Sequence, residues 1–214
     1  MSLGWINVFF SNCTQIVSVK DSHSNSTNFT SGVPQGSVLG PTLFLLYIND
    51  IVDSIQSDVR LFADDSMIYR SISSESDHHI LQSDLNTISK WCIDWSMELN
   101  TIKCRQIAIT NKCKSSSFVY HLLGKAVPQT SSHDYLVVTI THDLRWNTHC
   151  ANIANKSNKV LGIICRNLKP CSKPVKKRAY ETLVRPKVEY ASEAWNPHTD
   201  QDVNKIEHVQ KNAA

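Results

Sequence analysis

A long stripe of apolar residues at helical spacing constrains the fold of this chain more than any other feature. Steps of four and three residues separate its members, so they share one face of a single helix. The members are Leu81, Leu85, Ile88, Cys92, Trp95 and Leu99. Ser74 and Asp77 have the spacing of a capping box at the start of this helix. Another element must cover the apolar face, and we expect Trp95 to lie in the resulting core.

Two strand-like runs precede this helix and predict a pair of strands. Residues 59–63 and 66–69 are short apolar segments on either side of Asp64 and Asp65. Such runs, joined by a tight turn, predict a β-hairpin whose tip carries the acidic pair. The other strand-like segments are residues 14–19, 105–110, 118–121 and 135–140.

The helical segments lie at both ends of the chain and around the hairpin. Residues 5–10 are typical of the end of a helix, and the apolar segment 38–55 predicts a buried helix with Pro41 in its first turn. From residue 147 onward the pattern is mainly helical; the apolar positions of its later helices are Val175, Ala179, Leu183, Val203, Ile206 and Val209. This order predicts an α+β fold with a mixed domain at residues 1–142 and a helical domain at residues 143–214.

The composition is that of a globular chain. Hydrophobic residues make up 41% and charged residues 19% of the 214 positions, a balance that excludes wholesale disorder. The longest apolar run, residues 43–48, is too short to cross a bilayer, and the N-terminus lacks the pattern of a signal peptide. Seven scattered cysteines form no Cys-x-x-Cys pair. We therefore expect an intracellular protein, cytoplasmic or nuclear, with free thiols rather than disulfides or a zinc site.

Asp64 and Asp65 are candidate metal ligands. Adjacent carboxylates repel each other unless a cation lies beside them. Mg²⁺ suits such a pair, because it takes one or two protein carboxylates and completes its shell with water and phosphate oxygens. An isolated Asp-Asp pair is more often a solvated turn, so this hypothesis depends on other features of the chain.

A glycine-rich turn upstream is a second polar feature. Its residues are Gly32, Val33, Pro34, Gln35, Gly36 and Ser37. Backbone N–H groups in such a turn, followed by a helix, can approach a phosphate or a base closely. Taken alone, the same pattern is typical of an ordinary loop with a helix cap.

Positive charge gathers in the C-terminal part of the chain. Residues 156–187 contain ten Lys or Arg and a single acidic residue, Glu181, although the whole chain carries only +3. This asymmetry favours contact with a nucleic-acid backbone over a merely solvated helical face. The cations predicted to make that contact are Lys173, Lys176, Lys177 and Arg178. Tyr180 and Trp195 are expected to pack inside the fold rather than to stack on bases.

Two long motifs in order resemble the reverse transcriptases of LINE-type (non-LTR, jockey-like) retrotransposons. The first runs from Thr30 to Ile51 and contains the glycine-rich turn, and the second is Leu61-Phe62-Ala63-Asp64-Asp65. The resemblance continues through Asp84-Leu85-Asn86, Lys103-Cys104, Ala179 to Pro186 and Trp195 to His198, and so covers nearly the whole chain.

This resemblance implies an RNA-directed DNA polymerase with a right-hand palm, an antiparallel sheet with packed helices, followed by a mainly helical thumb. Asp64 and Asp65 would hold Mg²⁺, or Mn²⁺ in its place. The Gly32–Ser37 turn would line the template and the incoming nucleotide, and Lys103 would lie near the nucleotide phosphates or, equally, in solvent. The implied partners are an RNA template, a DNA primer and deoxynucleoside triphosphates, with no membrane; no oligomeric state is implied.

Three departures from the family pattern bear on activity. Family members carry another metal-binding aspartate on a strand before the segment that matches Trp5, and this chain begins after that point, so we expect it to be inactive alone. Val137 stands where the family usually has a glycine, in a turn thought to touch the primer, and Cys13 stands where Arg is common. Two alternatives stay open: a catalytically dead nucleic-acid-binding remnant, and a pseudogene product that does not fold stably.

Overall fold

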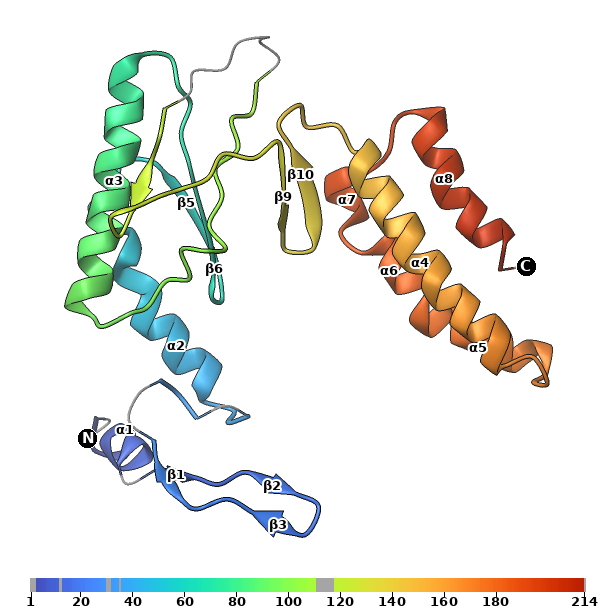
Figure 1. The fold of residues 1–214 in the computed structure, drawn as a ribbon, viewed down its shortest axis with the longest axis horizontal. Coiled ribbons are helices and arrows are strands. Elements are labelled where there is room, and N and C mark those ends of the chain that lie inside the picture. The colour runs from blue at the N-terminus through green and yellow to red at the C-terminus, as the bar shows by residue number, and fades with distance from the viewer. Residues whose placement is uncertain (1–2, 12, 30–31, 35, 111–117, 214) are drawn as a thin grey trace. The chain divides into compact units, whose positions relative to one another are not determined.

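The computed structural model describes residues 3–11, 13–29, 32–34, 36–110 and 118–213. They divide into two compact units, Met1–Trp95 and Ser96–Ala214. Each sheet in the described residues is an antiparallel pair of strands, and helices accompany these pairs in both units (Figure 1). The described fold is therefore α+β, as predicted. None of the described helices is long and apolar enough to span a membrane.

The first unit begins with a helix and a narrow β-ribbon. Helix α1 (Leu3–Phe10) confirms the helical end predicted at residues 5–10. The ribbon consists of β1 (Thr14–Gln15), β2 (Ser18–Val19), β3 (Ser22–His23) and β4 (Thr27–Asn28). In it β1 pairs with β4, and β2 pairs with β3 (Figure 1). The strand predicted at residues 14–19 is thus two short strands.

Helix α2 (Gly40–Ile48) and the 3₁₀ helix η1 (Asn49–Val52) replace the single buried helix predicted at residues 38–55. Pro41 does lie in the first turn of α2. The prediction of burial was wrong, since Leu46 is 70% exposed. Few of the described residues cover this helix, which contacts η1 and, through Tyr47, the end of the next helix.

The predicted acidic hairpin is confirmed. Strands β5 (Asp58–Phe62) and β6 (Asp65–Tyr69) pair in the antiparallel sense and leave only Ala63 and Asp64 in the turn. The long helix α3 (Glu75–Asp94) follows, and its N-terminus has the predicted capping box between Ser74 and Asp77.

Trp95 is a correction, because it does not lie in a core. Helix α3 ends at Asp94, so Trp95 leaves the apolar stripe and is 49% exposed. Its ring stacks on Trp91 with centroids 6.0 Å apart and meets the edge of Tyr47 at 5.8 Å. The three rings join α2 to the end of α3.

The second unit begins with two hairpins, β7 (His121–Leu122) with β8 (Lys125–Ala126), and β9 (Ser132–Tyr135) with β10 (Val138–Thr141). Among the described residues of segment 105–110, the predicted strand is reduced to one isolated bridge at Gln106. The strand predicted at residues 118–121 contributes only its last residue to β7. The one predicted at residues 135–140 is a hairpin turn flanked by the ends of two strands.

The turn of the β9–β10 hairpin is strained. Leu136 and Val137 are its two central residues, with φ angles of 48° and 69°. Two-residue turns with positive φ at both positions favour Gly and Asn, because a Cβ crowds the left-handed backbone. A β-branched residue such as Val is especially unfavourable there. Val137, singled out as a departure in the sequence, thus occupies a position that suits glycine.

Replacing Val137 with glycine is expected to stabilise the second unit by about 1 kcal/mol, since it relieves left-handed strain and loses little buried area. Urea unfolding followed by far-UV circular dichroism measures the change. Val138→Gly is the matched control, because Val138 is already in strand β10 and its replacement should destabilise. Equal destabilisation by both changes would contradict the strain at Val137.

Helices form the core of the second unit, as the pattern from residue 147 onward predicted. They are α4 (Asn147–Asn167), α5 (Lys173–Leu183), α6 (Arg185–Glu189), α7 (Ser192–Trp195) and α8 (Asp200–Lys211). Trp195, only 2% exposed, packs in their core, and its Nε1–H donates to the carbonyl oxygen of Tyr190 at 2.7 Å. Tyr180 packs against the same core. The expectation that both side chains are packed is confirmed.

Candidate functional site

The acidic pair lies at the tip of the β5–β6 hairpin. Asp64 is the second turn residue, and Asp65 is the first residue of β6, paired with Phe62. Ala63 precedes them with a φ of 50°, which turns the chain sharply at this point. Both aspartates are exposed. Neither side chain makes a hydrogen bond or ion pair with any described residue. The tip therefore presents two adjacent carboxylates that the described structure leaves available to a cation.

Two carboxylates of α3 fix the base of this hairpin. Asp84, which is buried, accepts the backbone N–H of Gln56 at 3.1 Å and of Ser57 at 2.9 Å, just before β5 begins. Asp77 forms an ion pair with Arg70 at 3.3 Å, just after β6 ends. The flanks of both strands are thus attached to one helix, which gives the acidic tip a rigid support.

Asp77 has a perturbed pKa because it is so well hydrogen-bonded. The backbone N–H of Ser73, and then the hydroxyl and N–H of Ser74, together with Arg70, lower the pKa of its carboxyl from 3.8 to about 2. Asp77 stays ionised at neutral pH and keeps its hydrogen bonds. Its stabilising effect is present above pH 3.8 and is lost as the pH falls toward 2.

The donor chemistry of the tip, two exposed carboxylates, suits a hard divalent cation. Among the described residues, no group of three or more His, Cys, Asp or Glu side chains is placed to share a metal ion. Mg²⁺ commonly binds through one or two carboxylates and fills its remaining positions with water and phosphate oxygens. Asp64 and Asp65 can supply that number of ligands.

The glycine-rich turn before α2 has the backbone geometry expected of its sequence. Gly32 and Gly36 have φ angles of 83° and 81°, in the left-handed region that glycine tolerates best. The hydroxyl of Ser37 donates to the carbonyl of Pro34 at 2.8 Å and accepts the N–H of Gly40 at 3.0 Å. Ser37 therefore fixes the start of α2 with its side chain. Gln35, the remaining polar residue of this predicted site, lies outside the described residues.

Gly40 is a residue of this turn that sequence reasoning missed. A Cβ at this position would lie 2.9 Å from the Ser37 hydroxyl and 3.1 Å from the Pro34 carbonyl oxygen. Only glycine allows that close approach without a shift. Gly40 is the first residue of α2 and needs no positive φ, so the sequence alone did not indicate that glycine is required at this position.

Lys103 lies in the turn-rich segment after α3, and its side chain is exposed. Its backbone N–H donates to the carbonyl of Asn100 at 3.0 Å, which fixes the backbone of the turn. Lys103 belongs to the second unit, whereas Asp64 and Asp65 belong to the first.

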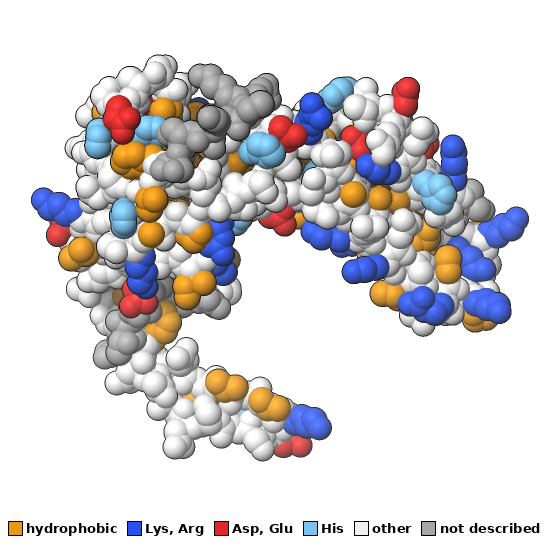
Figure 2. Space-filling model, turned by 45° about the horizontal axis from the view of Figure 1, so that its top comes forward, with side chains coloured by type: hydrophobic (Ala, Val, Ile, Leu, Met, Phe, Trp, Pro, Cys, Tyr) orange, Lys and Arg blue, Asp and Glu red, His pale blue; other side chains and the backbone are white. Residues whose placement is uncertain are grey.

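The basic cluster, defined as Lys173, Lys176, Lys177 and Arg178, lies on α5. All four side chains are exposed, and Lys and Arg gather around this end of the second unit (Figure 2). Lys176 Nζ donates to the Lys169 carbonyl at 3.2 Å, and Lys177 lies 3.8 Å from Glu181. The first turn of α5 contains no acidic residue. Cations near a helix N-terminus oppose the helix dipole, so helix stability does not explain this cluster.

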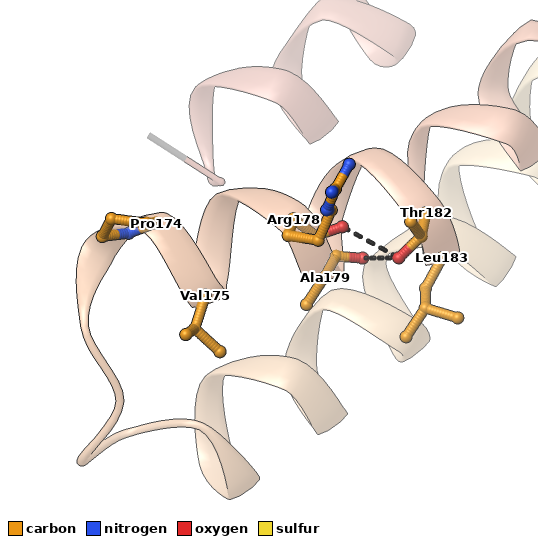
Figure 3. Close-up of a pocket in the computed structure, with 6 residues that line it drawn as sticks. All are labelled: Pro174, Val175, Arg178, Ala179, Thr182 and Leu183. Carbon is orange, nitrogen blue, oxygen red and sulfur yellow. Dashed lines mark hydrogen bonds between the residues drawn. The ribbon is translucent and has the colours of Figure 1, made fainter.

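An open hollow of about 520 Å³ runs along α5 beside the basic cluster. Val175, Ala179 and Leu183 point to one side of the helix, and Arg178 points to another (Figure 3). Val175 and Leu183, whose spacing predicted this helix, are exposed. The hollow contains no buried polar group, and this makes it a surface feature rather than a reaction site.

Asp84 is the supporting residue that sequence reasoning did not identify. It falls between Leu81 and Leu85 on the apolar face of α3, and an acidic residue on such a face needs donors nearby. That position was the available signal. Its partners lie 27 and 28 residues away, so spacing along the chain does not identify them.

Comparison with known proteins finds one matching family model and several relatives. The family model described as reverse transcriptase (RNA-dependent DNA polymerase) matches residues 1–165. The RNA-directed DNA polymerase from mobile element jockey of Drosophila melanogaster is 26% identical; the match covers 96% of this chain and 24% of that protein. The probable RNA-directed DNA polymerase from transposon X-element of the same species is 28% identical, over 89% of this chain and 22% of that protein. The chain thus spans about a quarter of the length of these relatives. No solved structure matches significantly.

Proposed function

The chain belongs to the reverse transcriptase family, and from that premise we propose that it forms the palm and the thumb of an RNA-directed DNA polymerase from a LINE-type retrotransposon. In this proposal residues 1–142 are the palm and residues 143–214 the thumb. The observation that carries it is the exposed carboxylate pair at the tip of the β5–β6 hairpin, inside the segment that the family model matches. The relatives named above are RNA-directed DNA polymerases from mobile elements, which agrees with the proposed reaction.

Asp64 and Asp65 act as ligands of Mg²⁺, or of Mn²⁺ in its place. Bound divalent ions supply Lewis-acid stabilisation of the attacking and leaving oxygens in nucleotidyl transfer. The chain contributes the rigid position of its two carboxylates. Asp84 and Asp77 maintain that position, since they hold the flanks of β5 and β6 against α3.

The glycine-rich turn lines the template and the incoming deoxynucleoside triphosphate. Gly32 and Gly36 act through their backbone, which in a glycine turn can approach a ligand closely. Pro34 shapes the turn between them, and Gln35 contributes a polar side chain. Ser37 acts indirectly, because its hydroxyl is engaged with Pro34 and Gly40 and sets the shape of the turn. Lys103 contributes a positive charge toward the nucleotide phosphates.

The basic cluster binds the phosphate backbone of the RNA template and of the DNA primer. Phosphate contacts of this kind release bound counterions, and binding therefore weakens steeply with salt. The argument for this role is the exposure of all four cations together with their unfavourable placement for helix stability.

Nucleic-acid binding without catalysis is the alternative function. The observation that favours it is Val137, whose strained turn lies in the segment that the family uses near the primer. On this alternative the basic cluster keeps its role, and the acidic tip has none.

Replacing the basic cluster by glutamines is expected to reduce the salt slope of primer–template binding by about 3.6, at about 0.9 for each lost phosphate contact. Fluorescence anisotropy with a labelled RNA–DNA primer–template, titrated between about 50 and 200 mM salt, measures the slope. A control variant carries glutamine at Lys20, Lys90, Lys125 and Lys211, which removes the same charge elsewhere. An equal change in both variants would contradict the proposed contact.

The Asp64→Ala variant separates the two functions. Binding to the primer–template without metal should survive this change on either reading, whereas tightening by Mg²⁺ should be lost only if the acidic tip holds the ion. Mg²⁺ tightening that persists in Asp64→Ala would favour the alternative function.

A further inference from the structure

A buried histidine joins the β9–β10 hairpin to helix α4. His149 lies in the first turn of α4 and is 2% exposed. Its Nδ1 accepts the backbone N–H of Thr139, in β10, at 3.0 Å. Because Nδ1 is the acceptor, the neutral ring carries its proton on Nε2. This bond depends on the neutral form of the ring.

The position of Thr139 explains why its amide needs a partner outside the hairpin. In the two-residue turn, Tyr135 and Val138 form the hydrogen-bonded pair that closes the loop, so the next pair, Thr139 and Asp134, is not hydrogen-bonded. The N–H of Thr139 therefore points away from β9. Buried amides are almost always hydrogen-bonded, and His149 supplies the acceptor for this one.

The remainder of the histidine ring lies in an apolar setting. The ring of Trp195 approaches it edge-on, with centroids 4.9 Å apart, and Trp146 lies at 6.4 Å. Nε2 is buried and has no hydrogen-bond partner among the described residues. The proton that the neutral ring carries on Nε2 therefore has no described acceptor, and a cationic ring would gain no hydrogen bond there.

Few charges act on the ring. Burial lowers the pKa of His149 below 6.5; Asp134, on β9, raises it and Lys156, on α4, lowers it, both as smaller effects. The hydroxyl of Thr139 donates to Asp134 and accepts from Asn152, which engages that carboxylate within the hairpin. The balance of these groups favours the neutral ring.

We propose that His149 is a pH-sensitive clamp, which holds β10 against α4 when the ring is neutral and releases the hairpin when the ring takes up a proton. A proton on Nδ1 would point at the N–H of Thr139, so a donor would face a donor. The clamp follows from the contacts within the second unit and is independent of the proposed polymerase function.

The direction of the pH effect follows from the sign of the shift. A pKa below 6.5 in the folded state means that the unfolded chain binds the proton more readily. The stabilising effect of His149 is therefore present above pH 6.5 and is lost as the pH falls below it. The folding equilibrium constant of the second unit should fall by up to about tenfold for each pH unit in that range. The effect of Asp77 is lost in a more acidic range, as the pH falls toward 2, and Asp77 belongs to the first unit.

The test is a nuclear magnetic resonance titration of the unsubstituted chain between about pH 8 and pH 5. The ring signal of His149 is expected to titrate below the ordinary histidine value of 6.5, and the amide signal of Thr139 should change in step with it. A His149 ring that titrates at or above pH 6.5, or a Thr139 amide that does not respond, would overturn the clamp.

Unfolding measurements on two variants give a second, independent readout. His149→Asn keeps an acceptor near the place of Nδ1 but cannot take up a proton, so its stability should be lower yet flat over about pH 8 to 5. His133→Asn removes an exposed histidine of β9 and should keep the pH dependence of the original chain. A His149→Asn chain whose stability still falls with pH as steeply as the original would also overturn the proposal.

Discussion

Replacing Trp195 with alanine is expected to lower the free energy of unfolding of the second unit by about 3–5 kcal/mol. Trp195 is among the most buried large side chains of the described structure. It packs with the buried residues of α4, α6 and α8, and its Nε1–H bonds the Tyr190 carbonyl. Its removal leaves a cavity beside His149 and an unpaired carbonyl. A loss of this size is a large part of the total stability of a typical domain.

Urea unfolding followed by far-UV circular dichroism measures the loss, with hydrogen exchange of α4 amides as a local readout. Trp5→Ala is the control, because Trp5 is half exposed on α1 and belongs to the other unit. We expect that control to change stability by less than about 0.5 kcal/mol. A Trp195→Ala chain that loses less than the control would contradict the assigned core.

Replacing Asp84 with alanine is expected to destabilise the first unit by about 3 kcal/mol, because two backbone N–H groups lose a charged acceptor in a buried place. The groups are the amides of Gln56 and Ser57, which lead into β5. Since β5 ends at the acidic tip, the same change should also weaken cation binding by Asp64 and Asp65. Stability and cation affinity would then fall together although the metal ligands are intact.

Two variants on α3 check this account of Asp84. Asp84→Asn keeps one acceptor oxygen and should lose less stability than Asp84→Ala. Asp94→Ala removes an exposed carboxylate from the end of the same helix and should be nearly neutral. Thermal unfolding of the three variants ranks their stabilities. An Asp94→Ala loss equal to that of Asp84→Ala would contradict a specific stabilising role for the Asp84 hydrogen bonds.

Local patterns in the sequence were sufficient for the elements that short-range physics decides. The capping box at Ser74 and Asp77 was confirmed, because its hydrogen bonds connect residues three apart. The hairpin around Asp64 was confirmed as well, since two apolar runs separated by a tight turn have few alternatives. The helices after residue 147 follow from spacing in the same way.

Predictions failed where neighbours distant in sequence decide the outcome. Apolar residues alone suggested that segment 38–55 is buried, but burial depends on what covers a helix, and Leu46 is exposed. Trp95 continued the apolar stripe by spacing, yet α3 ends one residue earlier. The strand expected at residues 135–140 contains Leu136 and Val137, whose residue types give no signal of a turn with positive φ.

The same distinction between short-range patterns and long-range contacts applies to the candidate site. Asp64, Asp65 and the glycines of the turn were identifiable from residue type and motif, and the structure places them on a hairpin tip and in a left-handed turn. Of the residues that support the site, Asp77 was identifiable from its capping box, but the partners of Asp84 were not. Asp84 accepts backbone amides 27 and 28 residues away, and only the fold brings such groups together.

The measurement that tests the central claim most directly is paramagnetic line broadening by Mn²⁺ in the nuclear magnetic resonance spectrum of the chain. We predict that low concentrations of Mn²⁺ broaden the amide signals around Ala63, Asp64 and Asp65 before any others in the first unit. The broadening should disappear in Asp64→Asn/Asp65→Asn and persist in the matched control Asp53→Asn/Asp58→Asn. Broadening that is absent from the tip, or that survives the loss of both tip carboxylates, would contradict a metal-binding role for this hairpin.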